Sequence, residues 1–399
     1  MPAFTHVKMR NISQANAFNL TPTQVEYQKL ACEFASRELT GQSAKFDRDA
    51  AAPSDLLKRM AAAGLTNVRL PEAFGGLNLN TFEACLIAEE LACGCSGVAG
   101  ISEASEMAIM PVIQFGSQAQ KQTLLTHLAG QPAFAGLALS FFEAAGAPLK
   151  AVREANHYVL SGIADRVANG SLSQWLLVEA EIVEANHAKT EVTGGNWAVF
   201  CLPSDCAGVK ATAGAPLLGR RASDIASIEC DKVKLSEDYR LTRGDERGPF
   251  VAELKRLNFP LIAVGSVGVA RAALAHATNY ARQRQTFGKP IIEHQVVAFM
   301  LADMARAIEA ARLLAWRAAK ACDAGLENEA LAIAALAYAQ EVVMNVTTDA
   351  VQIFGAYGYS KEYPVEKLMR DAKTYQIFAG TAEAAKGELG RGLLTKSID

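Results

Sequence analysis

Residues 352–383 read QIFGAYGYSKEYPVEKLMRDAKTYQIFAGTAE, and this stretch decides how the carboxy-terminal half of the chain is expected to fold. Glycines at 355 and 358 interrupt one long apolar run, and a second run begins at 364. Glycine clusters between periodic apolar segments mark turns between helices. The stretch therefore predicts two consecutive helices with a short turn between them, the second expected over 364–397.

Two more apolar runs precede this stretch, whose first helix is the end of a third run. Ala-, Leu- and Met-rich runs cover 261–284, 295–323 and 327–356, and breaks fall at Gly288-Lys289-Pro290 and at Gly325. Long apolar helices joined by short connections pack antiparallel to one another. The sequence predicts a four-helix bundle here.

The remaining chain divides into a helical zone and a strand-rich zone. Thr21-Pro22-Thr23-Gln24 has the composition of a capped helix start, and helical periodicity continues to about residue 128. The segments HYVLSG, QWLLVEAEIV, NWAVFCLP and IASIECDKVKL are β-prone and separated by turn residues. We therefore expect a mainly α protein with a central β domain: an N-terminal helical domain (1–130), a small antiparallel β domain (131–241) and a helical bundle (242–399).

The composition gives no indication of a nucleic-acid-binding, metal-binding, secreted or membrane-spanning protein. The chain has 399 residues and a net charge of −3, which gives no indication of nucleic-acid binding. Eight cysteines include no CxxC pair and no neighbouring histidine cluster, so we expect no metal site and buried thiols in a reducing cytoplasm. The N-terminus lacks a signal-peptide core, and no unbroken apolar run of about 18 residues predicts a membrane span.

The segment RQTFGKPIIEHQ, residues 284–295, lies where one predicted helix ends and the next begins. A helix start offers free N–H groups to phosphate oxygens, and a nearby arginine adds a charged contact. Together with DAVQIFGAYGYSKEYPVEKLMRDAK, residues 349–373, it closely resembles the C-terminal bundle of the acyl-CoA dehydrogenase flavoproteins, from about Gly265 to Leu394.

That resemblance implies FAD as the cofactor and a dimer or tetramer as the assembly, because FAD contacts cross a subunit boundary in this family. The residues implied to bind FAD of a neighbouring subunit are Arg284, Thr286, Phe287 and Gln295. Gln352 and Gly355 are implied to lie beside the adenosine half of FAD, and Thr381 is implied to lie near the flavin.

The resemblance also exposes a missing carboxylate. Phe378-Ala379-Gly380-Thr381 stands where the family has aromatic-Glu-Gly-Thr, whose Glu removes the proton next to the thioester. Some members carry that base at the position of Asn258, and most carry an arginine for the CoA end at the position of Phe259. Glu383 is a weak substitute for the base, one helical turn beyond Ala379.

Other acids near the expected pocket are more simply read as structural or solvated charges: Glu143, Asp165 and Glu253. In the middle zone Ser140 keeps a hydroxyl that meets the flavin in the family. Arg166 stands where the family has a tryptophan over the flavin, and Ala168 where it has a threonine near the reactive nitrogen.

Two kinds of function remain open at this point. The first is an FAD-dependent oxidoreductase acting on an acyl thioester of CoA or of a carrier, passing electrons to an acceptor protein. The second is a non-catalytic or split-site subunit that retains the fold. A flavoprotein with chemistry other than dehydrogenation is a variant of the first.

Overall fold

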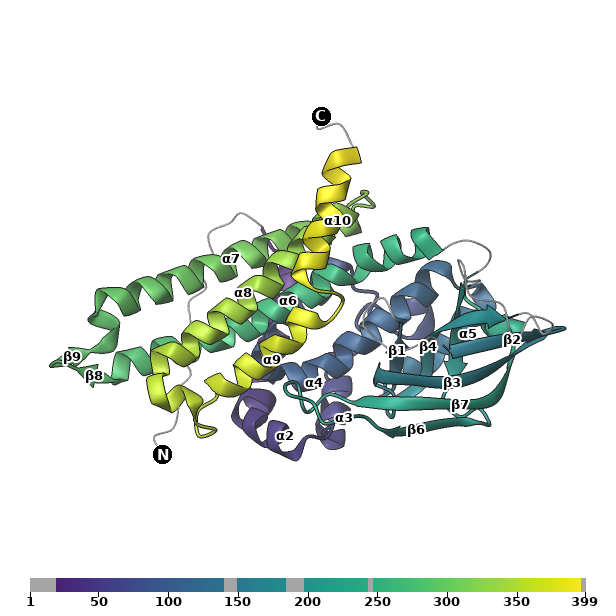
Figure 1. The fold of residues 1–399 in the computed structure, drawn as a ribbon, viewed down its shortest axis with the longest axis horizontal. Coiled ribbons are helices and arrows are strands. Elements are labelled where there is room, and N and C mark those ends of the chain that lie inside the picture. The colour runs from purple at the N-terminus through teal and green to yellow at the C-terminus, as the bar shows by residue number, and fades with distance from the viewer. Residues whose placement is uncertain (1–18, 140–148, 184–196, 243–246, 396–399) are drawn as a thin grey trace.

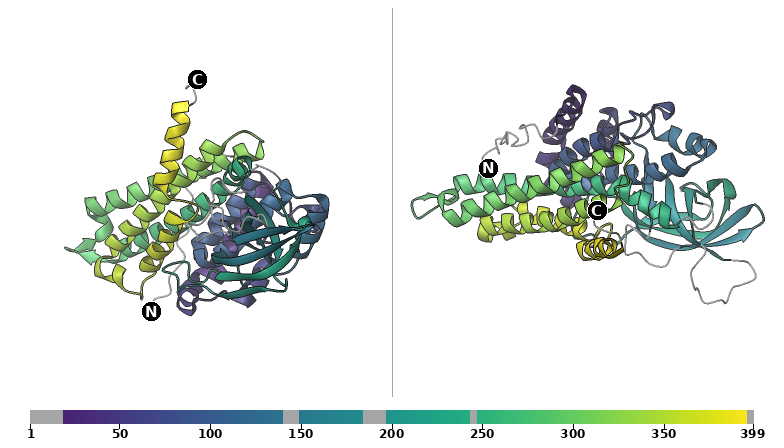
Figure 2. Two further views of the ribbon diagram at one scale, coloured as in Figure 1. Left: turned by 45° about the vertical axis from the view of Figure 1, so that its right-hand side comes forward. Right: turned by 90° about the horizontal axis from the view of Figure 1, so that it is seen from above.

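The structure is a computed structural model, and it describes residues 19–139, 149–183, 197–242 and 247–395. Helices from both ends of the chain pack side by side, and a β-sheet lies at one end of them (Figure 1). A two-stranded hairpin projects at the opposite end of the molecule, as the view from above in Figure 2 also shows. This is the helical, strand-rich, helical order expected from the sequence, while the domain boundaries at 130 and 241 stay predictions.

The N-terminal part consists of helices, and its first helix begins at the predicted capping box. The Thr21 hydroxyl accepts from Gln24 N, and the Gln24 side chain accepts from Thr21 N. The α-helices of this part are α1 (Pro22–Phe34), α2 (Ser43–Asp49), α3 (Ser54–Ala62), α4 (Thr81–Phe115) and α5 (Gln118–Leu125).

Helix α4 bends sharply at Cys95, whose backbone angles (φ −163°, ψ 104°) are not helical. The bend turns the second half of α4 back along the first half, so that residues from both halves line one cavity. It therefore sets the geometry of the site described below.

The sheet is built from seven strands: β1 (Phe134–Ala138), β2 (Leu149–Glu154), β3 (His157–Ala168), β4 (Ser173–Val183), β5 (Trp197–Pro203), β6 (Val209–Ala213) and β7 (Ile225–Ser236). β1 and β2 pair with successive stretches of β4 on one side and with β3 on the other. The pairings of β1 and β2 with β4 are parallel, whereas the other strand pairings are antiparallel, so the sheet that was expected to be antiparallel is mixed. The β-prone segments revealed strands but not the crossover that returns the chain to β4 in parallel.

The C-terminal part contains α6 (Arg247–Gln283), α7 (Gln295–Asp323), α8 (Glu329–Phe354), α9 (Val365–Ile377) and α10 (Ala382–Thr395), and the hairpin strands β8 (Gln285–Thr286) and β9 (Lys289–Pro290). The predicted breaks at 288–290 and 325 are confirmed. The single helix expected over 364–397 was wrong, because Ala379 (φ 63°) and Gly380 (φ 90°) leave the helical conformation and divide it into α9 and α10.

Three helical segments are long and apolar enough to cross a membrane by length and composition: α4, α6 and residues 329–359. Within the protein, 89%, 94% and 61% of their most apolar windows are buried. A helix that is apolar on all sides is expected in the core of a large helical protein. At the centre of that core, α4 and α8 pack against α6.

Candidate active site

The loop between α9 and α10 holds Ala379 at the position where a carboxylate was expected. Its backbone is left-handed, and its side chain is 8% exposed. Gln340 on α8 fixes the loop, because its Nε2 donates to the carbonyls of Tyr375 (3.0 Å), Phe378 (3.1 Å) and Gly380 (2.8 Å). A methyl group therefore occupies a rigidly held position.

Asn258 on α6 is fully buried, at 0% exposure, and accepts a hydrogen bond from Arg69. Arg69 also donates from Nε to Glu106 Oε2 (3.0 Å), from Nη2 to the Glu106 carbonyl (3.1 Å) and from Nη1 to the Leu257 carbonyl (2.9 Å). We call Arg69, Glu106 and Asn258 the Glu106 network. It joins the segment after α3, the second half of α4 and α6.

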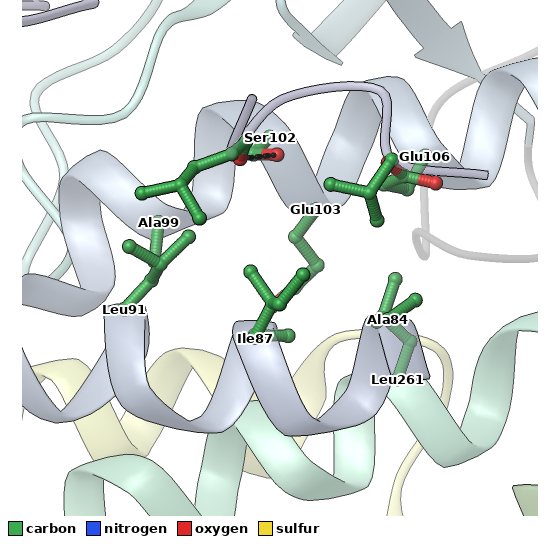
Figure 3. A pocket seen from close by; sticks show the side chains of 11 residues that line it. Ala84, Ile87, Leu91, Ala99, Ser102, Glu103, Glu106 and Leu261 are labelled. Atoms are coloured by element: carbon green, nitrogen blue, oxygen red, sulfur yellow. Dashed lines mark hydrogen bonds between the residues drawn. The ribbon is translucent and has the colours of Figure 1, made fainter. Parts of the chain in front are cut away.

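A small cavity lies between the two halves of α4, lined by aliphatic side chains and by two carboxylates (Figure 3). Ala84, Ile87 and Leu91 come from the first half, and Leu261 comes from α6, one turn beyond Asn258. The second half contributes Ala99, Ser102, Glu103 and Glu106. The cavity volume is about 20 Å³, which is room for about one water molecule.

Glu103 lies one turn before Glu106 and belongs to a different buried network. Its Oε1 accepts from Arg220 Nη1 and Nη2 (3.2 and 3.3 Å), and its Oε2 accepts from the Tyr375 hydroxyl (3.1 Å). Burial raises the pKa of the Glu103 carboxyl, and Arg220 and Tyr375 only partly oppose that effect. A side-chain carbon on Gly265 would come within 2.6 Å of the Tyr375 hydroxyl, so glycine is required there.

The same network extends to Asp371 on α9. Its Oδ1 accepts from the Arg220 backbone N–H (2.6 Å), and its Oδ2 accepts from Ser96 (2.7 Å) and Lys367 (2.5 Å). Burial opposes ionisation, but Lys367 and the other two donors keep the pKa of Asp371 below its usual value. We call this set the Asp371 network: Ser96, Glu103, Arg220, Lys367, Asp371 and Tyr375.

The predicted FAD residues of the hairpin region lie together at one end of the bundle. Arg284 and Gln295 are exposed, and the Thr286 hydroxyl lies 3.0 Å from His294 Nε2. Phe287 is 97% exposed at the hairpin tip, with a left-handed φ of 51°.

Gln352 and Gly355 lie at the same end, at the close of α8. Tyr280, four residues before Arg284, stacks on Phe354 with ring centroids 4.1 Å apart. A side-chain carbon on Gly355 would meet no atom within 4 Å among the described residues. The structure therefore brings two of the predicted FAD groups to one exposed end.

The other predicted site residues lie away from that end. Arg166 is exposed on β3 with φ 56°, whereas Ala168 is buried between β1 and β7. Thr381 caps α10 by accepting from Ala384 N (3.2 Å). Within one chain the hairpin and the sheet lie at opposite ends (Figure 2), and Ser140 lies outside the described residues.

The acids considered as substitutes for the base have clear locations. Glu383 is exposed on the first turn of α10, which stands away from the body of the protein in Figure 1. Asp165 accepts from Ser227 (2.5 Å) at the surface, and Glu253 forms a two-fold ion pair with Arg256 (2.5 and 2.6 Å). Glu143 lies outside the described residues.

Sequence reasoning did not find the two buried networks. Their partners are far apart in sequence: Arg69 binds Glu106, and Arg220 binds Glu103 and Asp371. A charge inside an apolar helical run is the only available signal, and Glu103 and Glu106 in the second half of α4 carry it. Such a signal indicates a buried charge but does not name its partner.

Comparison with known proteins identifies the family. Residues 21–131 match the model of "Acyl-CoA dehydrogenase, N-terminal domain", and residues 255–394 match that of "Acyl-CoA dehydrogenase, C-terminal domain". The Caenorhabditis briggsae protein named "Probable medium-chain specific acyl-CoA dehydrogenase 2, mitochondrial" is 31% identical over 95% of this chain and 92% of its own length.

Solved structures agree with that assignment over nearly the whole chain. Butyryl-CoA dehydrogenase from Megasphaera elsdenii is 31% identical with a TM-score of 0.87, covering 94% of this chain and 99% of the other. A chain from work on the electron transferring flavoprotein of Acidaminococcus fermentans is 30% identical with a TM-score of 0.88, covering 95% and 100%. The expected fold, enzyme class and FAD cofactor are thereby confirmed, and the chain belongs to the acyl-CoA dehydrogenase family.

Proposed function

We propose that this protein is an FAD-dependent oxidoreductase of acyl thioesters that works without a carboxylate at either of the two usual base positions. Full-length similarity to butyryl-CoA and medium-chain acyl-CoA dehydrogenases is the observation that carries the reaction class. The side chains at the two positions, Ala379 and Asn258, are a methyl group and an amide, and neither accepts a proton at neutral pH.

The residues at the hairpin end fit the cofactor. Arg284 offers a guanidinium for phosphate oxygens, Gln295 offers an amide near the start of α7, and Phe287 presents an uncovered ring. Bound FAD supplies the hydride acceptor of the reaction. Gln340 holds the 378–381 loop, and Thr381 lies exposed beside it for contact with the flavin.

The separation of these groups along one chain supports a site completed by a second copy, and so a homodimer or homotetramer. An exposed aromatic side chain at a hairpin tip is a common anchor at such contacts. We further propose an electron-acceptor protein as redox partner, a CoA or carrier-protein thioester as substrate, and a cytoplasmic location. The eight cysteines are all free, which supports a reducing compartment.

The first experiment is to purify the full chain and record its visible absorption before and after anaerobic addition of acyl-CoA thioesters. A yellow protein that is bleached by a thioester is the expected result. Arg284→Ala should weaken FAD binding about ten- to hundred-fold, the effect of losing a hydrogen bond from a charged group. Arg282→Ala, two residues earlier and also exposed, is the matched control and should retain the flavin.

The alternative is a non-catalytic or split-site subunit, which Ala379 and Asn258 favour. That reading predicts a colourless protein that gains flavin only when a related partner chain is added. Flavin bound by the chain alone and reduced by a thioester would exclude it. A yellow protein that no thioester bleaches would instead favour flavin chemistry other than dehydrogenation.

A further inference from the structure

Two buried polar atoms of the Glu106 network have no hydrogen-bond partner among the residues that the structure describes. They are Glu106 Oε1 and Asn258 Nδ2. The residues are 3% and 0% exposed, and each binds the same Arg69 guanidinium through its other polar atom. Unsatisfied polar atoms in the interior cost about 1–3 kcal/mol each. Two such atoms in one network therefore need a physical explanation.

The free atoms complement each other. A carboxylate oxygen accepts a hydrogen bond, and an amide nitrogen donates one. One water molecule can accept from Asn258 Nδ2 and donate to Glu106 Oε1 at the same time. Glu106 lines a cavity with room for about one water. Asn258 does not line it, but α6 reaches the cavity at Leu261, one turn further along the helix.

We propose that Glu106 is the proton acceptor of this protein and that it acts through one water held by Asn258. The inference rests on the proposed function, under which Asn258 stands at one of the two usual positions of the base. A general base can work through a single bridging water.

The step balances in atoms and electrons. The α C–H bond breaks and its proton passes to the water, while a water proton passes to Glu106 Oε1. The electron pair left on the α-carbon would form the new double bond as the β-carbon gives up a hydride, and FAD, held by Arg284 and Gln295 under the proposed function, would supply the hydride acceptor. Asn258 and Arg69 are positioning residues, because they orient the water and the carboxylate.

Glu103 is the nearest competing carboxylate, and its contacts argue against it. Both of its oxygens already accept hydrogen bonds, from Arg220 and from Tyr375. Taking a proton on Oε1 would cost the hydrogen bonds from Arg220, and taking one on Oε2 would require the Tyr375 hydroxyl to change from donor to acceptor. Glu106 takes a proton on a free oxygen and keeps its bond to Arg69 on the other.

The test follows proton transfer separately from oxidation. Acetyl-CoA has an α-carbon but no β-carbon, so it cannot be oxidised, and exchange of its α-protons in D2O reports the base alone. The wild-type holoenzyme should exchange them. Glu106→Gln should slow the exchange about 10²–10⁴-fold, a typical general-base contribution, and should lower kcat for butyryl-CoA with little change in KM.

Two further variants keep the test decisive if Glu106→Gln folds poorly. Asn258→Ala leaves the Arg69–Glu106 pair intact but removes the donor for the water, and exchange should again slow. Adding Ala379→Glu to Glu106→Gln supplies a carboxylate at the usual position, and oxidation should recover. Glu89→Gln is the matched control, since Glu89 is also buried and arginine-paired on α4 but does not line the cavity.

The outcomes separate the two proposals. Wild-type exchange rates in folded Glu106→Gln and Asn258→Ala, with butyryl-CoA still bleaching the wild-type flavin, would overturn the role of Glu106 alone. A wild-type protein that binds no flavin and is bleached by no thioester would overturn the proposed function itself. Slow exchange in both variants beside normal exchange in Glu89→Gln supports the proton acceptor.

Discussion

Two buried arginine–glutamate pairs lie one helical turn apart on α4, and they differ in how completely their carboxylates are used. In the Asp371 network every oxygen of Glu103 and Asp371 accepts a hydrogen bond. In the Glu106 network one carboxylate oxygen is left without a partner among the described residues. A saturated carboxylate holds structure together, whereas a carboxylate with a free oxygen can take part in chemistry.

The largest effect on stability should come from Asp371. Asp371→Asn removes the charge that Lys367 faces in the interior and weakens the bonds from Ser96 and Arg220. Breaking a buried ion pair in this way costs about 3–5 kcal/mol. Urea unfolding should show this loss, while Asp55→Asn, which breaks the exposed pair with Lys58, should cost less than about 1 kcal/mol.

The dependence of the unfolding free energy on pH also tests the role of Asp371. Its pKa is lowered in the folded protein, so its contribution is present above the unfolded-state value of about 3.9 and is lost as pH falls through the folded-state pKa. Unfolding free energy measured from pH 5 downward should therefore decline less steeply in Asp371→Asn than in wild type. An equally steep decline would show that the Asp371 carboxylate is not stabilised by the fold.

An intermediate loss of stability is expected on substitution of Gln340, which connects α8 to the end of α9 and to the loop after it. Gln340→Met keeps the approximate shape but leaves three carbonyls without this donor, a loss of about 1–3 kcal/mol. Amide hydrogen exchange of residues 378–381 should accelerate. Gln376→Met is the surface control on α9, and exchange in the loop should not change there.

The smallest effect should come from Ala379 itself. An alanine in the left-handed region costs about 1 kcal/mol of stability, and glycine removes that cost. Glycine also gives the unfolded chain more conformational freedom, which lowers stability by about 0.4–1 kcal/mol. Ala379→Gly should therefore change stability by less than about 1 kcal/mol. Ala310→Gly, at an exposed position inside α7, should destabilise by about 1 kcal/mol, and a similar loss at 379 would contradict the backbone argument.

Local sequence predicted the elements whose signals are local. The Thr21 capping box, the break at Gly288 and the strand segments were found because turn residues and periodicity lie within a few positions of one another. The division at Ala379 was missed because alanine ordinarily continues a helix, whereas here contacts with Gln340, far away in sequence, hold the loop. The parallel pairing of β4 and the partners of Arg69 depend on residues distant in sequence, which no local pattern records.

The position of the hairpin has a consequence for measurements at low protein concentration. Under the proposed assembly, the hairpin-end residues that bind FAD and the 378–381 loop that contacts its flavin come from different copies of the chain. Cofactor affinity then becomes linked to association by mass action, so dilution should release flavin even when no side chain has changed. Specific activity would fall with dilution, and added FAD would restore it.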